Sequence, residues 1–202
     1  MRFVPIFPSF LLLASLLASL TPAKAGFSTV VLDAGHGGHD RGGIPGQRVS
    51  EKAMALDVAQ RVQEILRDEG LRTVMTRSDD TFIPLPTRTA IANARCNAVF
   101  VSIHFNAAPR SGACGFETYY FRSKACTLAT LLHARIAKLG IGENRGIKRR
   151  AYYVLRKTNI PAVLCEPGFL TNPEYGSMMM RPAQRQRLAV AIASAIISAS
   201  RN

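Results

Sequence analysis

Three short apolar runs in this chain each lead into a polar residue, and this pattern constrains the fold more than any other feature. The runs cover residues 29–33, 98–103 and 162–165. A nearly continuous apolar run is typical of a buried strand in a parallel sheet. In open α/β sheets, ligands gather just beyond the carboxyl ends of the strands. We therefore expect His36, His104 and Glu166, which follow these runs, to converge in space.

Hydrophobic spacing and helix end signals predict the remaining elements. Ser50 and Gly70 bound an amphipathic stretch as N-cap and C-terminal stop. We expect helices at residues 51–69, 86–95, 124–139 and 182–200. We expect strands at residues 29–33, 71–76, 98–104, 116–121, 152–156 and 161–166, with a loop around residues 140–146. This alternation predicts an α/β fold, a three-layer domain with a six-stranded mainly parallel or mixed sheet flanked by helices.

The first 25 residues have the pattern of a secretory signal peptide. Arg2 precedes an apolar run at residues 10–20, and Ala23 to Ala25 form a small-x-small cleavage site. The run is too short for a membrane span, which needs about 20 residues. We expect cleavage after Ala25, a single domain over residues 26–202, no membrane-spanning segment, and export to the periplasm or to the extracellular space and cell wall.

The net charge limits the classes of partner. Cleavage would remove Arg2 and Lys24 and lower the formal charge from +13 to +11. A strongly basic protein attracts polyanions through screened Coulomb forces. For an exported chain, anionic cell-wall polymers and membrane surfaces are the expected polyanions, and nucleic acid is not an expected partner.

Four cysteines, Cys96, Cys114, Cys126 and Cys165, follow the predicted signal peptide. An oxidising compartment would permit up to two disulfides among them. A bridge from Cys114 to Cys126 is disfavoured, because the strand predicted between them carries the chain about 20 Å away. The chain has no CxxC pair, which argues against a zinc site made of cysteines.

Two histidines and two glutamates have the sequence context of a metal hydrolase site. Glycines at positions 35, 37 and 38 allow the backbone to turn sharply around His36. Glu51 lies in the first turn of a predicted helix, where the helix dipole alone would explain a carboxylate; its place after the glycine-rich loop also suits a metal ligand. A catalytic zinc site needs three protein ligands, an open position and a base, and His36, Glu51, His104 and Glu166 supply that set. His39 and His133 are expected to be ordinary surface or core residues.

Several motifs in a fixed order resemble the zinc-dependent N-acetylmuramoyl-L-alanine amidases of the Amidase_3 family. The matching stretches are residues 31–38, 50–52, 76–77, 92–93, 102–107, 115–117 and 163–172. The resemblance implies that His36, Glu51 and His104 are zinc ligands and that Glu166 is the catalytic glutamate. The chain departs from the common family pattern at Arg41 and Gly43 in the first loop and at Asn97, none of which is an expected ligand.

The resemblance implies hydrolysis of the amide between N-acetylmuramic acid and L-alanine of the peptidoglycan stem peptide. Two alternatives remain open at this point: another exported zinc amidohydrolase, either a peptidase or a glycan deacetylase, and a non-catalytic wall-binding module. A peptidase of the HExxH class is disfavoured because that motif is absent. Peptidoglycan is the expected partner, with anionic wall polymers and a regulatory protein as further candidates.

Two further groups of residues are candidates for supporting roles. Asp33, Ser102 and Asn106 flank the expected ligands and could orient them through hydrogen bonds. A basic cluster could bind carboxylates of the substrate, or could form a solvated face. Its members are Arg145, Lys148, Arg149, Arg150, Arg156 and Lys157.

Overall fold

A computed structural model describes residues 26–201, so the predicted signal peptide at residues 1–25 lies outside the described residues. Six strands form one sheet in the order β2-β1-β3-β6-β4-β5. The strands are β1 (Thr29–Ala34), β2 (Arg72–Met75), β3 (Ala98–Ile103), β4 (Phe116–Tyr120), β5 (Asn144–Arg149) and β6 (Ala162–Glu166). β2, β1, β3 and β6 are parallel, whereas β4 runs antiparallel to β6 and parallel to β5. The sheet is therefore mixed, as predicted.

The central strands bring their carboxyl ends to one edge of the sheet. Every residue of β1 and β3 is buried, as their apolar sequences predict. In the parallel ladder, Ala34 lies opposite Ile103, and Ile103 lies opposite Cys165 of β6. Because the register is nearly flush, the residues that follow each strand leave the sheet at the same edge.

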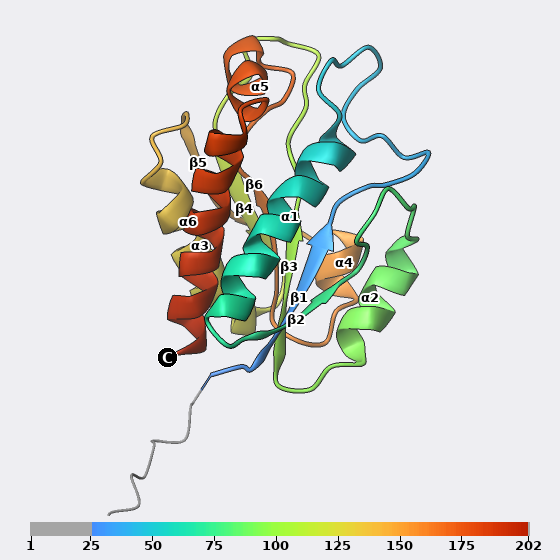
Figure 1. The fold of residues 1–202 in the computed structure, drawn as a ribbon, viewed down its shortest axis with the longest axis vertical. Coiled ribbons are helices and arrows are strands. Elements are labelled where there is room, and N and C mark those ends of the chain that lie inside the picture. Colours follow the sequence, from blue (N-terminus) through green and yellow to red (C-terminus); the bar gives the residue numbers. More distant parts are fainter. Residues whose placement is uncertain (1–25, 202) are drawn as a thin grey trace, which may run out of the picture.

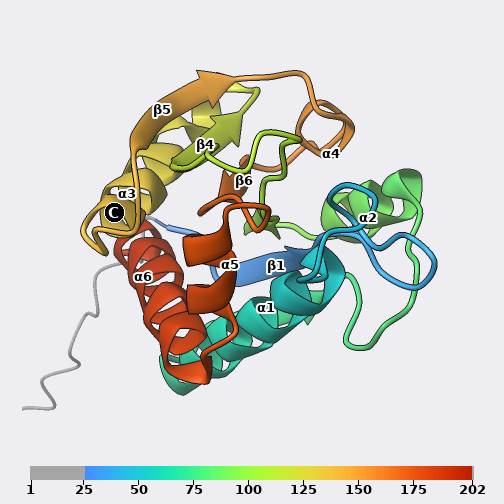
Figure 2. The same cartoon turned by 90° about the horizontal axis from the view of Figure 1, so that it is seen from above.

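Helices cover both faces of the sheet and make three layers (Figures 1 and 2). On one face lie α1 (Glu51–Asp68), α3 (Cys126–Ala137) and α6 (Pro182–Ser200), which enclose the larger apolar core. On the other face lie α2 (Leu85–Asn93) and α4 (Tyr153–Arg156), which pack over a smaller core that includes Phe100 and Val154. A 3-10 turn, η1 (Ser123–Ala125), leads into α3.

Two predictions around residues 140–156 were wrong. The segment expected to be a strand at residues 152–156 forms α4, and part of the expected loop at residues 140–146 belongs to β5. β5 is an edge strand of sequence NRGIKR that pairs only with β4, so it has no apolar alternation to reveal it. Val154 and Leu155 of α4 are both buried. Adjacent apolar residues in so short a segment are also typical of a short strand, which explains the wrong prediction.

The other predicted elements are confirmed, each within two residues at either end. One further helix, α5 (Pro173–Met179), had not been predicted. Its start signals are nevertheless present, because Asn172 accepts hydrogen bonds from the backbone N–H groups of Glu174 and Tyr175, and Pro173 occupies the first helical position.

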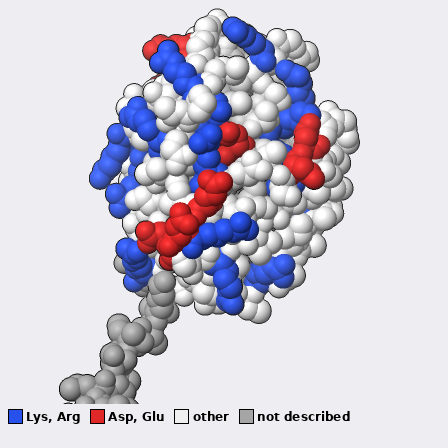
Figure 3. Space-filling view, viewed as in Figure 1, with Lys and Arg blue, Asp and Glu red and all other residues white. Residues whose placement is uncertain are grey.

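The surface charges, the cysteines and the hydrophobicity of the helices can also be compared with the predictions. On the face shown in Figure 3, lysine and arginine side chains are spread widely, whereas aspartate and glutamate occur in a few groups. The four cysteines all have free thiols. Among the described residues, no helix is both long enough and apolar enough to cross a bilayer.

The core position of α3 gives a first testable prediction. Leu132 is fully buried between α3 and the sheet, so Leu132→Ala should lower the free energy of unfolding by about 2–5 kcal/mol through lost burial and a cavity. Val190 on α6 is 50% exposed, so Val190→Ala should change the free energy of unfolding by no more than about 0.5 kcal/mol. Urea denaturation followed by circular dichroism measures both, and equal effects would contradict the described packing.

Candidate metal centre

His36 lies in a tight turn directly after β1. Its backbone is left-handed, with a φ of 60°, which is uncommon for a residue other than glycine. The turn also needs Gly35, because a Cβ atom there would come within 2.4 Å of the His104 ring. The Nδ1 atom of His36 lies 2.9 Å from Asp40 Oδ2, which leaves Nε2 facing Glu51. The turn therefore places one imidazole nitrogen at the carboxyl edge of the sheet.

Glu51 and His104 meet His36 at this edge. Glu51 Oε1 lies 3.0 Å from both His36 Nε2 and His104 Nδ1, and it also accepts a hydrogen bond from the backbone N–H of Phe105. All three potential ligand atoms lie within 4.8 Å of one another. Gly42 closes the far side, where a Cβ atom would come within 2.6 Å of Glu51 Oε2. Two imidazoles and one carboxylate at this separation fit a tetrahedral ion with one open position.

The electrostatic environment keeps Glu51 charged. Burial by itself would raise its pKa, but hydrogen bonds from His104 and His36 lower the pKa to about 2. A metal ligand must be deprotonated. Glu51 is therefore in the form that binds a cation.

Glu166 ends β6 and lines the same pocket. This cavity of about 630 Å³ is also lined by His36, Glu51 and His104. One oxygen of Glu166, Oε2, is buried and has no hydrogen-bond partner in the described residues. Burial raises the pKa of Glu166 well above its usual value, and the negative charges of Glu51 and Glu117 add to the effect. A buried carboxyl group whose oxygen is unpartnered at a candidate metal site has the properties of a proton-transfer group.

Two buried arginines hold the His36 turn, and sequence reasoning missed their role. Arg88 donates hydrogen bonds to the carbonyl oxygens of Ala34 and His36, at 2.7 and 2.6 Å. Arg77 donates to the carbonyl oxygens of Ala34 and Gly35, at 2.9 and 2.7 Å. Because each arginine is far in sequence from the backbone atoms that it contacts, no local sequence pattern predicts these contacts. The only signal was Thr76-Arg77 among the stretches that resemble the family.

Asp33 supports the turn through Arg88 rather than by touching a candidate ligand. Its carboxylate is buried and accepts hydrogen bonds from Arg88, Ser102 and Thr76 at 2.6–2.8 Å. Burial by itself would raise the pKa of Asp33, but Arg88, with help from the two hydroxyl groups, holds it below its usual value. The predicted supporting residues Asp33 and Ser102 thus belong to one buried network.

Two members of the predicted basic cluster form ion pairs within the protein. Arg145 Nε and Lys148 Nζ each lie 2.7 Å from Glu117 Oε1 on β4. These contacts offset the burial of Glu117 and lower its pKa to about 2. Asn106, another predicted supporting residue, donates to the other oxygen of Glu117 at 3.3 Å. Arg145 and Lys148 therefore share Glu117 as an ion-pair partner within the protein.

The two remaining histidines lie outside the site. His133 is buried in α3, where its ring nitrogens contact Thr118 Oγ1 and Asn144 Oδ1. His39 stacks on Phe82, with ring centroids 4.2 Å apart. Neither belongs to the His36, Glu51 and His104 group.

Comparison with known proteins identifies the family of this chain. The family model described as Amidase_3, N-acetylmuramoyl-L-alanine amidase, matches residues 30–198. The chain belongs to this family. Members of the family are generally zinc-dependent.

Individual relatives support the assignment. A probable cell wall amidase, LytH of Staphylococcus epidermidis, is 39% identical over 176 residues, which cover 86% of this chain and 58% of LytH. The chain thus spans little more than half the length of the curated relatives it matches. The catalytic domain of CwlV, an N-acetylmuramoyl-L-alanine amidase from Bacillus (Paenibacillus) polymyxa var. colistinus, superposes with a TM-score of 0.80 at 38% identity, covering 85% of this chain and 97% of that domain.

A further relative was solved with a partner. The CwlD amidase of Clostridioides difficile, in complex with the GerS lipoprotein, superposes with a TM-score of 0.77 at 28% identity. The match covers 85% of this chain and 97% of CwlD.

The Asp33–Arg88 pair gives a second prediction. Arg88→Met should lower the free energy of unfolding by about 3–5 kcal/mol, because it leaves the buried Asp33 carboxylate without its counter-charge. Adding Asp33→Asn removes that unpaired charge, so the double variant should be more stable than the sum of the two single losses predicts. A double-mutant cycle in urea measures this coupling, and strictly additive losses would show that the pair does not act as a unit.

Proposed function

We propose that this protein is a zinc-dependent N-acetylmuramoyl-L-alanine amidase, which hydrolyses the amide between the lactyl group of N-acetylmuramic acid and L-alanine of the stem peptide. The observation that carries the proposal is the convergence of His36, Glu51 and His104 beside Glu166 in one pocket, in a chain that belongs to the amidase family. Peptidoglycan is the substrate under this proposal.

The donor set fits zinc. Imidazole nitrogen and carboxylate oxygen are common zinc ligands, and three protein ligands with an open position are typical of a catalytic site. Under this proposal His36, Glu51 and His104 hold the ion. When bound, zinc would polarise the scissile carbonyl and lower the pKa of water toward about 7.

Glu166 is proposed as the group that moves protons. Its raised pKa and unpartnered oxygen suit a carboxylate that accepts a proton from the attacking water as the water oxygen bonds to the carbonyl carbon. Glu166 then donates that proton to the amide nitrogen as the carbon–nitrogen bond breaks. The direct products are the lactyl carboxylic acid, which keeps the second proton of the water, and a stem peptide with a free amine. At neutral pH the acid loses that proton to the amine or to solvent, and the glutamate returns to its starting state.

Location and further partners follow from the same proposal. The signal-peptide pattern at residues 1–25 supports export to the periplasm or to the extracellular space and cell wall. The basic surface supports contact with anionic wall polymers (Figure 3). The complex of CwlD with GerS supports a protein regulator as a further candidate partner.

Digestion of purified peptidoglycan tests the proposed activity. The zinc-loaded protein should release stem peptides that begin with L-alanine, and a chelator should abolish this release until zinc is restored. Glu166→Gln should retain zinc while turnover falls about 10²–10⁴-fold, because proton transfer is lost. Mass spectrometry of the fragments and metal analysis of each variant provide the readouts.

A matched control and the contrary outcomes make this test specific. Glu64 is an exposed glutamate on α1, so Glu64→Gln should leave turnover unchanged. Intact muropeptides despite stoichiometric zinc would favour a binding module. Cleavage inside the stem peptide would favour a peptidase, and release of acetate would favour a deacetylase.

A further inference from the structure

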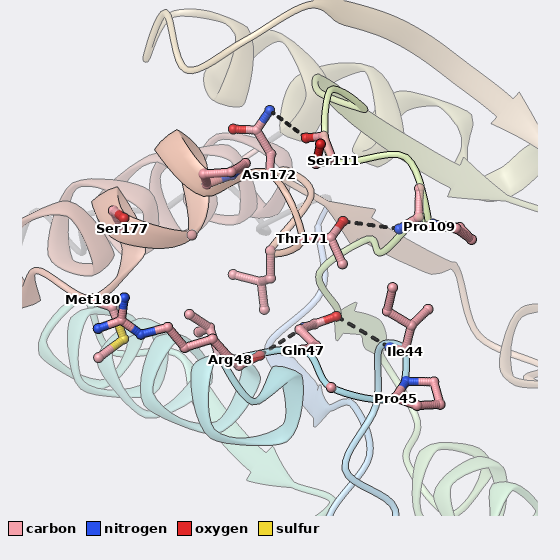
Figure 4. A pocket seen from close by; sticks show the side chains of 16 residues that line it. Ile44, Pro45, Gln47, Arg48, Pro109, Ser111, Thr171, Asn172, Ser177 and Met180 are labelled. Atoms are coloured by element: carbon pink, nitrogen blue, oxygen red, sulfur yellow. Dashed lines mark hydrogen bonds between the residues drawn. The ribbon is translucent and has the colours of Figure 1, made fainter.

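Figure 4 shows a second cavity, of about 620 Å³. It neighbours the catalytic pocket, because Ile44 lines both. Three segments wall it: residues 44–49 before α1, residues 108–111 after β3, and residues 170–180 after β6. These segments lead to or from Glu51, His104 and Glu166. Ile44 lines both cavities, and the neighbours Ala107 and Ala108 line one cavity each. The two cavities are therefore neighbours at the carboxyl edge of the sheet.

Hydrogen bonds between the walls fix the shape of this cavity. Asn172 donates from its side-chain amide to the carbonyl oxygen of Ser111, and the backbone N–H of Ala108 donates to Thr171 Oγ1 at 3.1 Å. Within the segment of residues 44–49, Gln47 donates to the carbonyl oxygen of Val49 at 2.7 Å. These hydrogen bonds hold the segments in place, which reduces the ordering cost of binding a ligand.

The charge of this cavity comes from a single side chain. Arg48 is exposed and extends along the cavity toward the side where α5 and Met180 lie (Figure 4). Within residues 26–201, Arg48 makes no ion pair and its guanidinium makes no hydrogen bond, unlike Arg145 and Lys148. Among residues 26–201, no acidic side chain lines the cavity. An arginine in this setting is free to bind a carboxylate.

The two cavities differ in their aromatic lining, so each suits a different half of the substrate. Phe82, Tyr152 and Tyr153 line the catalytic pocket and offer flat apolar faces suited to a sugar ring. In the described part of the chain, no aromatic side chain lines the second cavity, and its polar groups are mainly backbone, hydroxyl and amide groups. Such a surface suits a peptide better than a glycan.

We propose that the second cavity binds the stem peptide beyond its L-alanine, and that Arg48 pairs with a carboxylate of that peptide. This inference rests on the proposed amidase function and assigns a specificity role to the cavity. A four-residue peptide in extended form spans up to about 14 Å, which is ample to pass the single shared residue, Ile44. The cavity selects substrates that carry an acidic peptide.

Kinetics on three soluble substrates test the assignment with the zinc-loaded protein. The substrates are N-acetylmuramoyl-L-alanine, an N-acetylmuramoyl tetrapeptide, and the same tetrapeptide with its carboxylates amidated. The wild-type protein should show its lowest KM on the acidic tetrapeptide. Arg48→Gln should raise that KM about tenfold with kcat unchanged, as expected for loss of one charge-assisted contact made equally in ground and transition states. It should also abolish the preference over the amidated peptide.

Two further variants serve as controls. One tests the shape of the cavity without removing Arg48, and the other tests whether loss of any surface arginine has the same effect. Ser177→Trp keeps Arg48 but fills the cavity, so it should raise KM for both tetrapeptides and leave N-acetylmuramoyl-L-alanine unaffected. Arg95 is exposed just before β3, at the opposite end of the sheet, so Arg95→Gln should behave as wild type on all three substrates. Thermal unfolding of each variant confirms that the fold is retained.

The outcomes distinguish this inference from the proposed function. If the wild-type protein cleaves the substrates and Arg48→Gln keeps the full preference for the acidic tetrapeptide, the peptide subsite is wrong and the amidase function stands. If the wild-type protein cleaves none of the three substrates and no peptidoglycan, the proposed function fails, and the subsite fails with it.

Discussion

The buried contact between Asp33 and Arg88 is the interaction on which the candidate site depends. Asp33 belongs to β1, and its other hydrogen-bond partners come from the end of β2 and from β3, whereas Arg88 comes from α2. The same guanidinium reaches the carbonyl oxygens on either side of the His36 turn. One buried charge pair therefore ties three strands and a helix to the backbone that presents His36. Such a pair is costly to bury, and its value lies in fixing one geometry.

This rigidity explains how a left-handed histidine is tolerated. A residue other than glycine in that conformation is strained, and the conformation persists only where the surrounding structure fixes it. At His36 the surrounding structure does so, through Arg77 and Arg88 on the backbone and Asp40 on the ring. Gly35 and Gly42 then allow His104 and Glu51 to approach without a clash. The ligand group is thus arranged by the protein, and an incoming cation does not have to create it.

Much of the fold, and the grouping of the candidate site, could be read from the sequence. Apolar strands that end in His or Glu obey a simple rule of parallel sheets, so His36, His104 and Glu166 were expected at one edge and are found there. Glu51 was ambiguous, because a carboxylate in a first helical turn has an ordinary electrostatic explanation. The family resemblance implied that Glu51 is a ligand, and the tertiary contact with both histidines places it in the group.

Other features could not be predicted because they depend on contacts between distant segments. β5 has no apolar periodicity and is a strand only because β4 lies beside it. Arg145 and Lys148 looked available to substrate until the fold placed Glu117 between them. Arg48 carried no signal at all, and its interest arises from the cavity that the loops after β3 and β6 enclose. The sequence indicates which residues could bind a ligand, and the tertiary structure determines which of them are not already paired within the protein.

The zinc K-edge X-ray absorption spectrum of the protein loaded with one equivalent of zinc tests the central claim most directly. The account predicts nitrogen and oxygen ligands at about 2.0–2.1 Å, with the scattering signature of two imidazole rings. That signature should fall to one ring in His104→Ala. Sulfur scattering at about 2.3 Å, from the free cysteines, or a spectrum without imidazole would contradict the assignment of His36, Glu51 and His104 as the metal site.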